Sequence, residues 1–107
     1  MTEFRRIGEN NMKTVEEIRT KAKEILAGKE KAYQRIRLEL KEICGKEELN
    51  AEDMKNWKIL EFRKMDASNE LQAIKDAIVG MGILSSDEED EILADAKEEV
   101  AEEEQNE

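Results

Sequence analysis

Carboxylates are the groups in this sequence most able to do chemistry, and they gather towards its C-terminal end. The 23 residues from Ser85, SSDEEDEILADAKEEVAEEEQNE, hold twelve Asp or Glu and one basic residue, Lys97. Carboxylates bind metal ions, transfer protons in active sites, and bind positively charged surfaces. The residues around them decide which of these roles the sequence supports.

The partners that metal binding or catalysis would require are absent from the sequence. It contains no His, which excludes His-based acid–base catalysis, His triads and zinc sites that contain His. The run DEEDE from Asp87 has no glycine for the sharp turn of a calcium loop. Gly80 and Gly82 have neither the spacing nor the lysine of a phosphate-binding loop. We therefore expect no catalytic, cofactor-binding or metal-binding residues, and a protein that is not an enzyme.

Charge is segregated along the chain. The formal net charge is −10, but residues 1–84 hold 17 Lys or Arg against 16 Asp or Glu, while residues 85–107 carry −11. A field of this kind speeds association with a basic partner, and carboxylates spaced along a helix can stand in for phosphates. The competing interpretation is a helix that only solubilises. The acidic residues expected to contact a partner are Asp87, Glu88, Asp90, Glu91, Asp95, Glu98, Glu99, Glu102 and Glu103.

The composition predicts an all-α chain with a narrow core. There is no proline, 43% of residues are charged and 38% are hydrophobic, which favours long paired helices. The single cysteine, Cys44, forms no internal disulfide, so we expect a reducing, cytoplasmic setting and a small buried side chain beside a turn. No apolar run is long enough for a signal peptide or a membrane span, so we expect no membrane partner.

Two apolar stripes with heptad spacing predict a long antiparallel helical hairpin, similar to a coiled coil, within residues 12–84. The stripe of residues 14–44 consists of Val15, Ile18, Ala22, Ile25, Ala32, Ile36 and Ile43, widened by Leu26, Tyr33 and Leu40. The stripe of residues 50–81 consists of Met54, Trp57, Leu60, Ala67, Leu71, Ile74, Ile78 and Met81. In the register that pairs the stripes, Ile25 faces Leu71.

Further signals define the ends and the middle of the hairpin. Gly45 is expected to end the first helix in a left-handed conformation, and Asn50 to cap the second. The register puts Lys29 opposite Ala67, and Lys64 likewise opposite an alanine. We expect both lysines to extend outwards along their stems and to fix the register.

The two flanks of the hairpin differ. Residues 1–11 are polar and aperiodic, which predicts a flexible arm. Residues 85–107 are predicted to form a third, acidic helix that frays after Glu103, with Ser86 and Glu89 as a capping box. Its apolar stripe is thin and consists of Ile92, Leu93, Ala96 and Val100.

Three apolar side chains of the second helix, Ile59, Phe62 and Met65, lie away from its seam. If the third helix folds back along the second, Val100 reaches Met65, and the other two stay uncovered near the hairpin tip. Exposed aromatic and aliphatic side chains together mark interaction surfaces. We expect this patch to bind a partner protein or a second copy of the chain.

These observations lead to three functional hypotheses. The first is a non-enzymatic binding or regulatory module that inhibits a nucleic-acid-binding protein by occupying its basic surface with the acidic helix. The second is nucleic-acid binding by the first helix with an autoinhibitory acidic cover, which the interleaved glutamates and the few aromatic residues disfavour. The third is a structural scaffold or connector. The basic residues of the second hypothesis are Lys21, Lys23, Lys29, Lys31, Arg35, Arg37 and Lys41.

The size, charge and lack of catalytic groups match small accessory proteins of phages and mobile elements, by analogy alone. No motif identifies a family.

Overall fold

Three α-helices and no strand make up the described part of the computed structural model, which runs from Asn11 to Gln105 with side chains described from Thr14 onwards. The helices are α2 (Asn11–Cys44), α3 (Ala51–Gly80) and α4 (Ser86–Gln105). The predicted all-α class, with a long hairpin and a third acidic helix, is confirmed. The predicted flexible arm lies outside the described residues, apart from Asn11, which begins α2.

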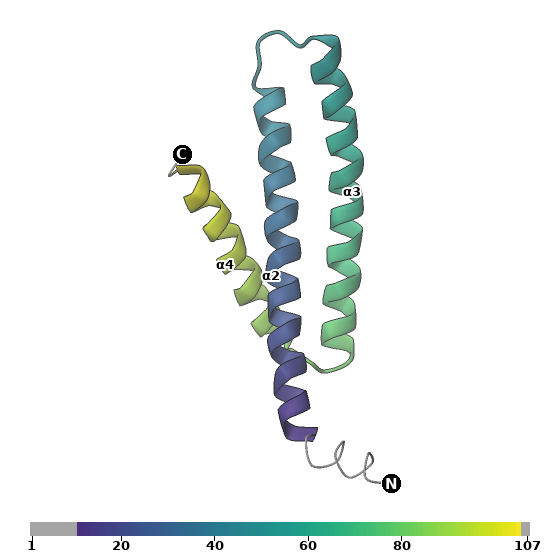
Figure 1. Ribbon diagram of the computed structural model, residues 1–107, viewed down its shortest axis with the longest axis vertical. Helices are drawn as coiled ribbons and strands as arrows, with labels where there is room; N and C mark the ends of the chain where they lie inside the picture. Colours follow the sequence, from purple (N-terminus) through teal and green to yellow (C-terminus); the bar gives the residue numbers. More distant parts are fainter. Residues whose placement is uncertain (1–10, 106–107) are drawn as a thin grey trace.

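The central helix of the molecule is α2. It packs antiparallel to α3 on one side and parallel to α4 on another. The helices α3 and α4 make little contact with each other (Figure 1). The third helix therefore does not fold back along the second, and the contact expected in that case between Val100 and Met65 does not apply. Val100 is buried, and Met65 remains 60% exposed. The basic side chains on α2 explain this choice, because they pair with carboxylates of α4.

Burial on α2 is centred on Leu26, which has no exposed surface. Val15, Ile18 and Ile25, predicted in the seam, are instead about half exposed, at 51%, 45% and 48%. The reason is that α2 has two neighbours, so the residues between the two contacts are covered most completely. The buried apolar residues are Ala22, Leu26, Leu40, Leu60, Leu71, Ile78, Leu84, Ala96 and Val100.

Polar contacts hold the hairpin tip. Asn50 caps α3 as predicted, in a reciprocal capping box with Asp53, and the Lys46 ammonium lies 2.7 Å from the same carboxylate. Two expectations at this end are wrong. Gly45 is not left-handed, and its lack of a Cβ instead avoids a close approach of 3.3 Å to a carbonyl oxygen. Cys44 is exposed, not buried beside the turn.

The turn between α3 and α4 is closed by Gly82, whose φ of 71° is the only positive value among the described residues. The Ile83 N–H donates to the Ile78 carbonyl, and the Gly82 N–H to Val79, which together form a Schellman motif. The side chains of Ile78 and Ile83 pack in the cluster that joins all three helices, which contains Ala22, Ile74, Ile78, Ile83, Leu84 and Ile92. This turn fixes the point at which α4 starts.

The start of α4 differs from the predicted capping box by one residue. Ser85, not Ser86, is the cap, and it exchanges two 3.1 Å hydrogen bonds with Glu88 instead of Glu89. This start lets the same Glu88 carboxylate reach Arg19 of α2. The helix continues to Gln105, two residues beyond the predicted point of fraying.

The polar waist of the hairpin contains an ion pair across the seam. The Lys29 ammonium lies 2.5 Å from Glu70, about one turn of α3 beyond the predicted position opposite Ala67. The side chain of Lys29 is 42% exposed, which agrees with a lysine extended outwards along its stem.

Candidate partner-binding surfaces

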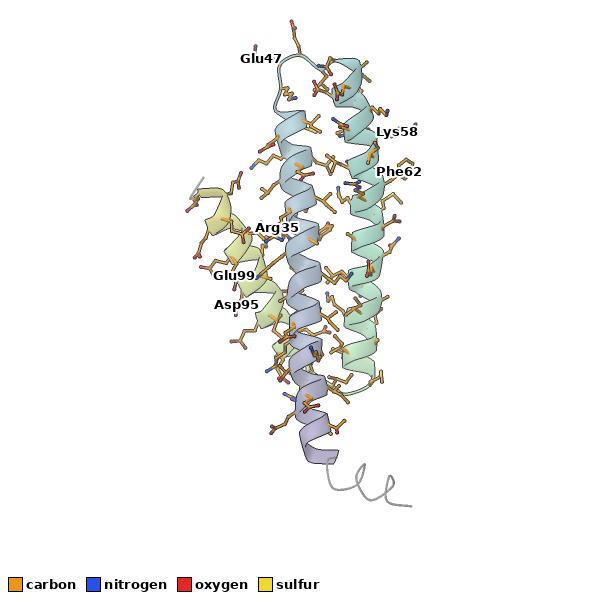
Figure 2. All side chains as sticks on the ribbon, viewed as in Figure 1. Arg35, Glu47, Lys58, Phe62, Asp95 and Glu99 are labelled. Carbon is orange, nitrogen blue, oxygen red and sulfur yellow. The ribbon has the colours of Figure 1, made fainter. Side chains whose placement is uncertain are left out.

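The inner face of α4 binds α2 through carboxylates. The pairs are Arg19–Glu88 at 2.7 Å, Lys31–Glu99, and Arg35–Glu103 at 3.1 Å. Arg35 and Glu99 face each other's helix in Figure 2. Because the two helices run in the same direction, the numbering offset between partners stays almost constant, and the contacts form a ladder along α2. Ala96 and Val100 are buried beneath the ladder.

The outer face of α4 carries a second set of carboxylates. Five of them, separated by four, four, three and four positions, share one side of the helix at about 100° per residue. They are Asp87, Glu91, Asp95, Glu98 and Glu102, of which Asp95 borders the hollow between α4 and α2. All five are exposed, and none forms an ion pair with any residue that the structure describes. We call this set the acidic stripe. At 1.5 Å per residue it is roughly 22 Å long.

The structure thus divides the nine acidic residues that the sequence grouped together. Glu88, Glu99 and Glu103 hold α4 on α2. Five form the acidic stripe. Asp90 is also exposed but lies farther round the helix. The division follows from the position of α2, which the periodicity of the acidic segment alone does not reveal.

Glu89 is a feature that sequence reasoning missed. It is buried, and its Oε2 atom has no hydrogen-bond partner among the described residues. Burial raises the pKa of this carboxyl, partly offset by the nearby charge of Lys75. Its neighbour Glu88 behaves in the opposite way, because the hydrogen bond from the Ser85 backbone, together with Arg19, holds its pKa below the ordinary value. Glu89 lies seven residues before Ala96 and eleven before Val100, so it shares their buried side of α4.

The basic residues of α2 are largely occupied within the chain. Lys31 and Arg35 pair with α4, Lys29 pairs with α3, and Arg37 stacks over the Tyr33 ring at 5.8 Å. Arg19, which the sequence did not single out, makes the most elaborate contact. It donates to the Ile83 carbonyl at 2.8 Å as well as to Glu88.

The apolar patch of Ile59, Phe62 and Met65 is open on α3, with exposed fractions of 41%, 60% and 60%. Figure 2 shows Phe62 on the outer side of α3, while Asp95 lies on α4 beyond α2. The patch and the acidic stripe therefore belong to separate surfaces, and one flat partner surface would not cover both.

Other classes of site are not apparent in residues 11–105. No three Cys, Asp or Glu side chains there converge in a way that would hold a metal ion. Of the three helices described, none is both long enough and apolar enough to cross a membrane. No family model, curated protein or solved structure matches this chain.

Proposed function

We propose that this chain is a non-enzymatic binding module that holds a basic surface of another protein, such as a nucleic-acid-binding channel, against the acidic stripe of α4. One observation supports the proposal. Five exposed carboxylates on one side of α4 have no ion pair in the described part of the chain, while three others attach the helix to α2.

The arrangement suits a charge-based contact for a physical reason. Because Glu88, Glu99 and Glu103 fix α4 on α2, the acidic stripe is ordered before a partner arrives, and binding costs less conformational entropy. Like charges along one edge also add their fields, which steers a basic partner during encounter. A surface that occupies a phosphate-binding channel in this way competes with nucleic acid.

Two variants of equal net charge test the proposal. One changes Glu91, Glu98 and Glu102 of the stripe to Gln, and the other changes Glu88, Glu99 and Glu103 of the inner face to Gln. The probe is a fluorescent oligo-arginine peptide, with binding followed by anisotropy. We expect the stripe variant to bind roughly tenfold more weakly at low salt, and wild-type binding to fall steeply towards 1 M salt, where the screening length is about 3 Å. If hydrogen exchange shows that α4 stays packed on α2 in both variants, equal weakening would show that only net charge matters and would reject the stripe as a site.

The ladder of ion pairs favours a second candidate function, in which α4 covers a basic face of α2. Arg19, Lys31 and Arg35 are the covered groups, and phosphates would compete with carboxylates for them. In this case the inner-face variant binds a labelled DNA duplex more tightly than the wild type, and the stripe variant does not. Truncation after Leu84 should enhance DNA binding further. If neither change increases binding to DNA, the cover hypothesis fails and the first proposal is unaffected.

A further inference from the structure

The hairpin has an open face on the side of α2 away from α4. Ile18, Lys21 and Ile25 lie roughly half a turn around α2 from Lys23, Ala27 and Lys31, which line its contact with α4. A groove of about 800 Å³ follows this open face between α2 and the end of α3. Its apolar lining includes Ile18, Ile25, Ile74, Ala77, Ile78 and Ile83.

Exposure along this groove is high for β-branched aliphatic residues in a folded chain. Ile18 is 45% and Ile25 is 48% exposed, and both were predicted from their spacing to be seam residues. Single exposed apolar side chains are common on protein surfaces, but contiguous ones that line a groove mark a contact. The heptad pattern of α2 therefore describes a face that the single chain leaves half covered.

The surface area of the chain is large enough for a dimer. The total is 8531 Å², whereas a folded monomer of 12.4 kDa exposes roughly 6,100 Å². The difference includes the surface of the twelve residues outside the described part, and it exceeds the roughly 800 Å² that each partner contributes to a stable interface.

Charge indicates which face two copies would use. Each chain carries a formal −10, so two copies repel unless their acidic parts are kept apart. The charged residues of the groove are few, Glu16, Glu17 and Lys21, and the acidic helix lies on the other side of α2. Contact through the groove face keeps the two α4 helices farthest from each other.

We propose that two copies of this chain pack groove to groove, with the two hairpins forming a four-helix core and the α4 helices on the outside. The contact is isologous, since each copy presents the same face to the other. Ile18, Ile25 and Ile74 fill the core layers that the single hairpin leaves open, as in four-helix bundles. The inference is independent of the proposed function, because the acidic stripe takes no part in the interface.

Sedimentation equilibrium of the full chain tests the proposal. We expect the wild type to have twice the 12.4 kDa chain mass at micromolar concentration. Ile18→Glu with Ile25→Glu should raise the dissociation constant by roughly a hundredfold or more, because charged groups would be buried without partners. Helicity should be retained, since both side chains are half exposed in the single chain.

A matched pair of exposed apolar residues serves as control. Phe62→Glu with Met65→Glu changes the patch on another side of α3 and should leave the dimer intact. Ile18→Ser with Ile25→Ser repeats the groove test without charge, in case the glutamate variant does not fold. A wild type that remains a monomer, or a dimer that only the Phe62 and Met65 changes dissociate, would overturn the proposal.

Discussion

The two neighbours of α2 are held by different kinds of interaction. On the α3 side the buried groups are long aliphatic side chains, among them Leu40, Leu60 and Leu71, with one ion pair at the waist. On the α4 side the buried groups are smaller, Ala96 and Val100, and three ion pairs contribute. One helix thus supports an apolar contact and a mostly electrostatic one.

The difference shows how a chain with few hydrophobic residues can combine a hairpin that is insensitive to salt with a helix whose position depends on salt. Fully burying a leucine or isoleucine stabilises by about 1.5–3 kcal/mol, more than an exposed ion pair does, and the effect depends little on salt. The hairpin should therefore withstand changes in ionic strength, whereas the position of α4 depends on them. Four variants test this contrast, from the largest expected effect to the smallest.

The largest effect is expected from Leu26→Ala. Leu26 has no exposed surface and lies between the two contacts, so its truncation removes apolar burial and leaves a cavity that costs about 2–5 kcal/mol. Urea denaturation followed by circular dichroism measures the loss. Met65→Ala is the control and should cost less than about 1 kcal/mol, since Met65 is 60% exposed. A loss at Leu26 no larger than at Met65 would contradict the assignment of the core.

The next largest effect is a gain of stability from Glu89→Leu. Relief of a buried, unsatisfied acceptor is worth about 1–3 kcal/mol. Burial raises the pKa of Glu89 above 4.5, so the folded chain retains this proton to a higher pH than the unfolded chain. The free-energy cost of burying the charged carboxylate therefore grows as pH rises above 4.5.

The gain from Glu89→Leu should therefore be full near neutral pH and shrink as pH falls towards 4.5. Glu89→Gln should remove the same pH dependence with a smaller gain, because an unpaired amide remains buried. Thermal denaturation between acidic and neutral pH measures both. A Leu variant that is less stable than the wild type at neutral pH would refute the interpretation.

A smaller and more local effect is expected from Glu99→Gln with Glu103→Gln. Loss of these two partly exposed pairs with Lys31 and Arg35 should speed amide hydrogen exchange in α4 by roughly two- to thirtyfold at low salt. Exchange in α3 should not change. Glu98→Gln with Glu102→Gln on the acidic stripe is the matched control. If the two variants exchange alike, the ladder does not hold α4.

The smallest effect is expected from Lys29→Gln, which removes the ion pair with Glu70 at the waist. The side chains are about half exposed, so we expect a loss of about 0.2–1 kcal/mol and no change of exchange in α4. A loss as large as that of Leu26→Ala would mean that charge, not apolar burial, holds the hairpin together.

Much of the fold was predictable because it depends on local signals. The three helices and the hairpin were predictable from heptad spacing, the Asn50 cap and the breaks around Gly45 and Gly82. The thin apolar stripe of α4 also predicted which side is buried, since it contains Ala96 and Val100. These features arise within one helix or between two neighbours in the sequence.

What could not be predicted depends on which helix α4 meets. The burial of Glu30 and Glu89, the half exposure of Ile18 and Ile25, and the division of the acidic residues into two sets all follow from the contact with α2. A signal for this contact was present in the sequence. Arg19, Lys31 and Arg35 are separated by twelve and four positions, and the separations of their acidic partners on α4 agree with these to within one residue. Interleaved glutamates on α2 hid this match.

The constant offset between α2 and α4 has a consequence for how the chain folds. The ladder joins residues 68 or 69 positions apart, whereas Lys46 and Asp53 at the tip are seven apart. Closing the longer loop directly costs roughly 2 kcal/mol more chain entropy, so the hairpin should zip from its tip and bring the start of α4 beside Arg19. Because α4 is synthesised after both other helices, each new chain exposes the basic side of α2 until its own acidic helix arrives.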